Sequence, residues 1–196
     1  FEPLRSTTQG RSQNNTTARS QRKTKKIDDV DAWLNVPSWK RVPLPSHLVA
    51  QELVDKKTWL LFMDEMGIAK AIADQLQQAK QTVICVFAGD SFSADGAETF
   101  VINPQQAIDY LTLLQELQQQ KKLPDSVLHL WNVTARLPTA ATRETFKQAQ
   151  WLGYYSLLFF AQALAQANVL TPLHIWAVSN HLQEVESHDT VQPEKA

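Results

Sequence analysis

Cysteine and glycine are scarce in this chain of 196 residues, and each shortage excludes a class of site. The single cysteine, Cys85, rules out a disulfide framework and any zinc site built on several cysteines. The five glycines do not have the spacing that a dinucleotide-binding loop or a phosphate-binding loop requires. The sequence therefore predicts that this chain does not bind a nucleotide through a glycine-rich loop.

An uninterrupted apolar run of membrane-spanning length is also missing. Residues 148–183 contain no Asp, Glu, Lys or Arg, but Gln150, Gln162 and Pro172 interrupt them. The first thirty residues lack the apolar core of a signal peptide. We therefore expect a cytoplasmic location and no membrane partner, with residues 148–183 forming a buried helix followed by a buried strand.

Charge is distributed unevenly, although the formal net charge is only -1. Residues 1–27 hold seven basic side chains and one acidic one, whereas residues 28–196 hold twelve and nineteen. A basic segment rich in Ser, Thr, Gln and Asn cannot bury enough apolar surface to offset the entropy of ordering. We predict a flexible basic linker over residues 1–30 and a folded acidic domain over residues 31–196. Nucleic-acid binding through the linker is a weaker alternative, because no aromatic residues are interleaved with its charges.

Short apolar runs alternate with amphipathic segments from residue 58 onward. The runs predict five strands, at residues 58–63, 82–87, 100–102, 126–131 and 173–178. Helices are predicted at 67–79, from an N-cap at Asn103, and at 144–167, and a short edge strand at 38–42. Strands that are apolar on both faces and alternate with helices predict an α/β fold. The expected architecture is a mainly parallel sheet of about five strands with helices on both faces.

Polar side chains follow several predicted strands, at the sheet edge where ligands bind in such folds. Asp64 and Glu65 could hold a ribose or a metal ion, but an acidic residue at a helix start is more often a cap. His129 lies between two leucines inside a strand, which is more typical of a core or interface histidine than of a catalytic one.

No catalytic or metal-binding pattern is complete in the sequence. His181, Glu184 and His188 do not match the spacing of the zinc motifs. Ser156 and Ser179 lie in apolar runs without a nucleophile elbow, and none of the three tyrosines has a lysine four residues later. We predict no catalytic, cofactor-binding or metal-binding residue in this chain.

Several short segments occur in an order that resembles one protein family. They are Trp33–Arg41, Trp59–Gly67, Phe100–Pro104, His129–Trp131, Gly153–Leu158, Val178–Asn180 and Pro193–Ala196. Together they resemble the ketoreductase region of modular type I polyketide synthases, and the likeness covers about residues 31–196. Within that family, Pro193–Ala196 resembles the start of a further helix.

The resemblance implies the structural subdomain of a ketoreductase, a truncated Rossmann-like half that has lost cofactor binding. This half supports a catalytic half that follows it in the family. The fragment itself would be non-catalytic and without a cofactor, whereas its parent multienzyme would use NADPH and phosphopantetheine. The implied partners are the downstream catalytic subdomain and, through the linker, an upstream acyltransferase, with no nucleic acid and no membrane.

The predicted helix at 144–167 carries more apolar surface than one face of a sheet needs, which indicates a partner surface. The candidate interface residues are Trp33, Trp39, Tyr154, Leu157 and Phe160. Alternatively, the Trp33–Trp39 segment folds over this helix within the chain. The alternative function is a free-standing flavodoxin-like α/β binding module or small enzyme.

Overall fold

The structure is a computed structural model that describes residues 39–40, 42, 55–135, 142–186 and 188–195. The chain divides into residues 1–38 and residues 39–196, and all described residues belong to the second part. The predictions for the linker at residues 1–30 and for Trp33 therefore lie outside the described residues.

Six strands form one sheet within the described part of the chain. They are β1 (Thr58–Phe62), β2 (Thr82–Ala88), β3 (Ser93–Asp95), β4 (Thr99–Ile102), β5 (Ser126–Asn132) and β6 (His174–Ser179). Their order across the sheet is β3-β4-β2-β1-β5-β6, and only the pair β3–β4 is antiparallel. The predicted α/β class and mainly parallel sheet are confirmed. β3 was not predicted, because its three exposed residues show no apolar pattern.

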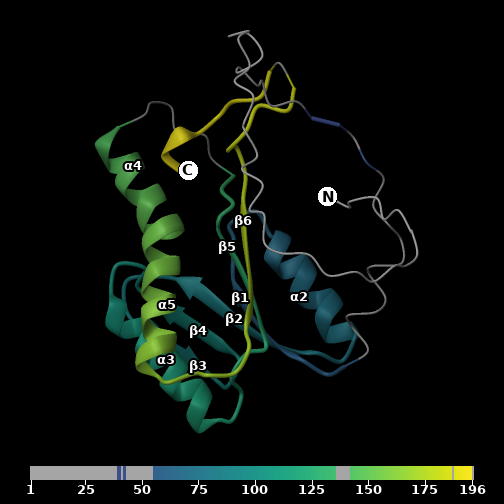
Figure 1. The fold of residues 1–196 in the computed structure, drawn as a ribbon, viewed down its shortest axis with the longest axis vertical. Coiled ribbons are helices and arrows are strands. Elements are labelled where there is room, and N and C mark those ends of the chain that lie inside the picture. The colour runs from purple at the N-terminus through teal and green to yellow at the C-terminus, as the bar shows by residue number, and fades with distance from the viewer. Residues whose placement is uncertain (1–38, 41, 43–54, 136–141, 187, 196) are drawn as a thin grey trace, which may run out of the picture. The chain divides into compact units, whose positions relative to one another are not determined.

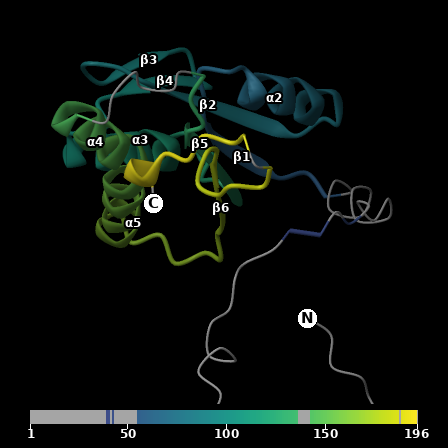
Figure 2. The same ribbon diagram turned by 90° about the horizontal axis from the view of Figure 1, so that it is seen from above.

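Helices cover both faces of the sheet (Figures 1 and 2). They are α2 (Ile68–Gln78), α3 (Ala107–Gln119), α4 (Arg143–Gln150), the π-helical turn η2 (Trp151–Tyr155), α5 (Ser156–Gln166) and the 3-10 turn η3 (Pro193–Lys195). α2 lies on one face, and α3, α4 and α5 lie on the other (Figure 1). This arrangement follows from the strands, which carry apolar side chains toward both faces.

The larger part of the core lies between the sheet and the pair α3–α5. Tyr110, Leu114 and Phe160 of these helices are buried against Phe62 and its neighbours, and the Phe62 and Phe160 rings meet edge to face at 5.5 Å. On the opposite face, α2 buries Ala69, Ala73 and Leu76, which are spaced three and four residues apart. The helix at 67–79 was expected from the spacing of Ile68, Ala71, Ile72 and Leu76, of which only Leu76 is buried, so the predicted helix is present with a different buried side.

The helix predicted from Asn103 begins later than expected. The Asn103 side-chain oxygen accepts a hydrogen bond from the amide of Gln105 at 2.9 Å, which closes a turn. Its side-chain amide donates to the carbonyl of Asp90 at 3.0 Å. The chain therefore turns at Asn103, and α3 begins at Ala107. The predicted N-cap at Asn103 is wrong because these contacts compete with a helix start.

The helix predicted at 144–167 is present as α4, η2 and α5 in succession. Its start is fixed by Thr142, whose hydroxyl accepts from the Thr145 amide at 3.1 Å in a capping box. The π-helical turn in the middle was not predicted. There Ser156 donates its hydroxyl to the carbonyl of Leu152 or Gly153, at 2.8 Å and 2.9 Å, and such a contact competes with the helical hydrogen bonds.

Two further expectations are wrong. β6 was expected to be buried, but it is the last strand of the sheet, and its residues are exposed except for the half-buried Ser179. The edge strand expected at 38–42 is not formed at the described positions Trp39, Lys40 and Val42. Within the described residues, no helix is both long and apolar enough to cross a membrane.

Candidate functional site

The strand order reverses at β1, and this reversal locates the candidate site. From β1 the sheet extends through β2 and β4 on one side and through β5 and β6 on the other. The chain leaves β1 for α2 on one face and leaves β5 for α4 on the opposite face (Figure 1). In open α/β sheets, the crevice between two such loops, at the carboxyl ends of the strands, is where ligands bind.

Asp64, the second residue after β1, caps the start of α2 with its carboxylate. One carboxylate oxygen accepts from the Ala69 amide at 2.6 Å, and the other accepts from the amides of Ile68 and Met66 at 3.1 Å and 2.9 Å. Gly67 makes this approach possible with a left-handed φ of 83°. The interpretation of Asp64 as a helix cap is therefore confirmed.

The C-terminal turn η3 and the residues before it enter the same crevice. The Lys195 ammonium donates to the side-chain oxygen of Asn180 at 2.6 Å and to the Thr134 hydroxyl at 2.8 Å. The Asn132 side-chain amide donates to the Lys195 carbonyl at 3.2 Å. Gln192 and Lys195 are buried, and burial lowers the pKa of Lys195. The polar side chains that follow β5 and β6 therefore already have hydrogen-bond partners within the chain.

A cavity of about 310 Å³ remains beside this turn. Its lining includes Glu65 from the β1–α2 loop, Thr145 and Gln148 from α4, and Glu194 from η3. The volume is at the lower limit of ligand pockets, and two carboxylates contribute to its wall. The cavity is therefore unsuited to a large anionic ligand such as a dinucleotide.

His129 and Ser156 form a buried pair behind the crevice. The Ser156 hydroxyl lies 2.8 Å from His129 Nε2. The Ser156 oxygen also lies 2.8 Å from the carbonyl oxygen of Leu152 and 2.9 Å from that of Gly153, so it is enclosed by partners within the chain. Desolvation by burial lowers the pKa of His129 to about 4. His129 and Ser156 are both buried, at 1% and 0% exposure, so the hydroxyl is not accessible to a substrate and the pair is a hydrogen bond of the core.

The described acidic and histidine side chains after β6 do not gather into a possible metal site. Asp189 instead accepts from the amides of Val185 and Glu186 at 3.0 Å and 2.9 Å, and these hydrogen bonds lower its pKa. No group of three or more metal-ligating side chains occurs in the part of the chain that the structure describes.

The candidate interface residues lie in different environments. Tyr154 is 60% exposed and lies against Tyr155, with ring centroids 5.3 Å apart. Leu157 is half-buried and Trp39 is exposed. Phe160, by contrast, is buried in the core beside Phe62, so it does not contribute to an exposed surface. An interface role for the exposed members stays a prediction.

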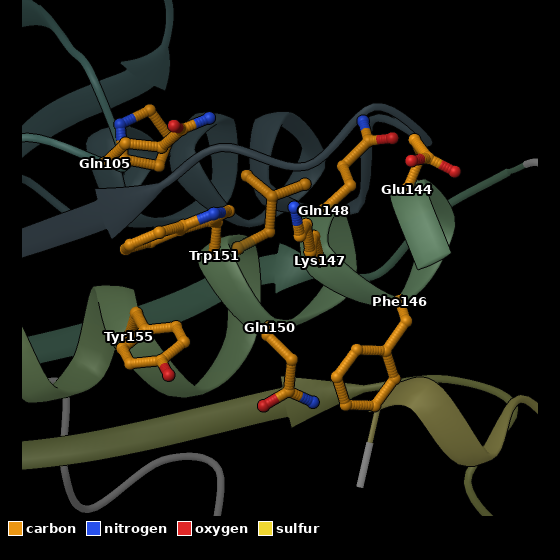
Figure 3. Close-up of a pocket in the computed structure, with 10 residues that line it drawn as sticks. Gln105, Glu144, Phe146, Lys147, Gln148, Gln150, Trp151 and Tyr155 are labelled. Carbon is orange, nitrogen blue, oxygen red and sulfur yellow. The ribbon is translucent and has the colours of Figure 1, made fainter. Parts of the chain in front are cut away.

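A wide groove lies beside Tyr155 along the α4–η2 helix, and Figure 3 shows its lining. Its volume is about 920 Å³. The rings of Trp151 and Tyr155 lie within it with centroids 4.6 Å apart and tilted by 36°, while Phe146 and Gln150 point to another side of the helix (Figure 3). Gln150 donates to the Glu194 carbonyl at 3.0 Å. Because the lining side chains diverge, the groove is an aromatic surface and not a closed pocket for a small ligand.

A mainly parallel sheet with helices on both faces defines a Rossmann-like domain. Comparison with known proteins shows the family to which it belongs. The model of the family described as "Beta-ketoacyl synthase-like, N-terminal" matches residues 57–189, and the chain belongs to this family. No curated protein sequence shows significant similarity to the chain.

Solved structures relate the fold to ketoreductases. A keto acid-selecting NRPS module with adenylation, ketoreductase and pseudo-Asub domains is 29% identical, with a TM-score of 0.65 over 81% of this chain and 12% of its own. An N-terminal ketoreductase from the macrolactin assembly line is 21% identical, with a TM-score of 0.56, and shares the fold over 64% of this chain and 25% of its own. The chain thus spans a small part of both proteins. The resemblance to a ketoreductase region is confirmed.

Proposed function

We propose that this chain is a non-catalytic structural subdomain that supports the NADPH-dependent β-ketoacyl reductase domain of a type I polyketide synthase multienzyme. The observation that carries the proposal is the occupation of the crevice by the chain's own charged groups, Asp64 and Lys195. The 29% identity to a protein that contains a ketoreductase supports the choice of multienzyme.

Asp64 opposes dinucleotide binding by electrostatics and by geometry. In dinucleotide-binding folds the pyrophosphate binds to the free amides at the start of the first crossover helix. Here the amides of Ile68 and Ala69 already donate to the Asp64 carboxylate. A phosphate at this position would lose those donors and would lie next to a negative charge. The same arrangement disfavours a flavodoxin-like module, which also needs a phosphate site at a strand–helix turn.

The description of the family suggests acyl transfer as a second candidate activity. Acyl transfer by a cysteine requires an accessible thiolate. Cys85 is half-buried in β2, and burial raises the pKa of its thiol. The thiol therefore stays protonated, which argues against a condensing activity in this chain.

The cofactors belong, in this proposal, to the partner segments of the multienzyme. NADPH binds the catalytic subdomain of the ketoreductase, and phosphopantetheine carries the acyl chain in the cytoplasm. The basic residues 1–30 connect the subdomain to an acyltransferase. The exposed side chains of Tyr154 and Tyr155 face the catalytic subdomain, because aromatic side chains are enriched at protein interfaces.

Titration calorimetry of the full chain with NADPH tests the absence of a cofactor site. We expect no binding tighter than about 1 mM. The variant Asp64→Asn keeps an acceptor for the helix amides and removes the negative charge. It therefore separates electrostatic repulsion of the cofactor phosphates from occupation of their binding position by the side chain. A dissociation constant in the micromolar range for the unmodified chain would refute the proposal.

The supporting role is tested by mixing the chain with the catalytic segment of a type I ketoreductase that lacks its own structural half. We expect the chain to raise the reductase activity and thermal stability of that segment. Tyr154→Ala should weaken the effect, whereas Ile108→Ala should not, although both side chains are 60% exposed. Equal effects of the two variants would contradict a specific surface at Tyr154.

A further inference from the structure

Among the described residues, one edge of β6 is unpaired, and the side chains on both of its faces are partly exposed. Within the described residues it pairs only with β5. Its large apolar side chains are partly exposed, with Ile175 at 44%, Trp176 at 40% and Val178 at 37%. Trp176 stacks on Trp59 at 5.6 Å, which holds its ring along the outer part of the sheet. Figures 1 and 2 show β6 at the end of the sheet.

The two edges of the sheet are built differently. β3, at the opposite edge, is three residues long and includes the charged Asp95, and both features discourage pairing with another strand. β6 is six residues long and contains no proline, lysine, aspartate or glutamate. An apolar edge without such protection offers its free amides and carbonyls to another strand.

We propose that β6 pairs with β6 of a second copy of this chain, so that one continuous sheet runs through both copies. A two-fold axis perpendicular to the sheet makes the two strands antiparallel and keeps each face of the sheet continuous. With the axis at Ala177, Trp176 of each copy lies opposite Val178 of the other, and Ile175 lies opposite Ser179. The smallest side chain of the strand is then opposite itself.

The side chains of β6 suit this pairing. Aromatic and β-branched side chains opposite each other stabilise antiparallel strands, by roughly 0.2–1 kcal/mol per pair. The strand has no Asp, Glu, Lys or Arg, so two copies meet without repulsion between such charges. One strand pair forms a small interface, and small interfaces are weak. We therefore expect a dimer that forms at tens of micromolar and dissociates below about 1 µM.

Sedimentation of the full chain over a range of concentrations tests the proposal. The mass should rise from 22.2 kDa toward twice that value. Val178→Lys places two like charges at the interface and should raise the dissociation constant at least about tenfold. Val185→Lys is the matched control, because Val185 is 57% exposed and lies outside the strand. Ile175→Lys is the second variant if Val178→Lys fails to fold by circular dichroism.

A cysteine at the two-fold axis tests the register. In a Cys85→Ser background, Ala177→Cys should form a disulfide between copies, because opposite residues of an antiparallel pair lie about 4.5–5.5 Å apart. Leu170→Cys, at an exposed position before the strand, should not. A chain that stays monomeric at several hundred micromolar would overturn the proposal and leave the edge to a strand of another protein. A dimer that is insensitive to Val178→Lys and is not linked through position 177 would also overturn it, because its contact lies elsewhere. The outcome is independent of NADPH binding, so it separates this inference from the proposed function.

Discussion

Replacing Asp64 by alanine should destabilise the domain measurably, although the residue lies at the surface of a loop. Its carboxylate accepts three backbone hydrogen bonds, and the one from Ala69 is partly buried. Loss of a capping side chain costs about 0.5–2 kcal/mol, and the amides of Ile68 and Ala69 would lose a charged acceptor. We expect a loss of about 1–2 kcal/mol in the free energy of unfolding. For a domain of this size that loss lowers the melting temperature by about 2–8 °C.

Thermal and urea unfolding followed by circular dichroism measure this effect. Asp74→Ala is the matched control, because Asp74 is an exposed acid on the same helix, 4.0 Å from Lys70. An exposed ion pair of this kind contributes only a few tenths of a kcal/mol. Asp64→Asn should retain part of the stability, since an amide oxygen still accepts hydrogen bonds. If Asp64→Ala is no more destabilising than Asp74→Ala, the carboxylate does not fix the start of α2 and the electrostatic argument against a phosphate at this turn fails.

Two further predictions concern the core. Because burial lowers the pKa of His129 to about 4 from an ordinary 6.5, the unfolded chain binds a proton that the folded chain does not over this range. Stability should therefore fall as the pH drops from 6.5 to 4, by up to about 3 kcal/mol. His129→Gln should flatten this pH dependence in urea unfolding, and equal slopes for both proteins would contradict the assignment. Phe160→Ala should cost about 3–5 kcal/mol because Phe160 is enclosed beside Phe62, and a cost below 1 kcal/mol would show that it is not.

The strands and most helices could be predicted from residue patterns because their signals are local. Apolar runs such as Thr82–Ala88 indicate a buried strand, and apolar residues spaced three and four apart indicate a helix. The cap at Asp64 was predictable for the same reason, since cap and helix are neighbours in the chain. β3 and the π-helical turn at Trp151–Tyr155 have no comparable pattern, so they were missed.

The crevice shows where local patterns stop being informative. Lys195 contacts Thr134 and Asn180, and the first of these is 61 residues away along the chain. Nothing near Lys195 indicates that its ammonium would occupy the carboxyl ends of two strands. The missing glycine loop predicts that the chain lacks a nucleotide site, and the contacts of Asp64 and Lys195 add a physical argument for it, but the absence of the site stays a prediction.

The sequence by itself determined most of the helices and strands of this protein, because the period of apolar side chains is set by the geometry of a helix or a strand. Only the tertiary structure decided where each element lies. β6 has the composition of a buried strand, yet it is the last strand of the sheet with both faces exposed. The apolar composition of a strand indicates that burial would stabilise it. Whether other elements cover that strand depends on the order of the strands in the sheet, which the whole chain determines.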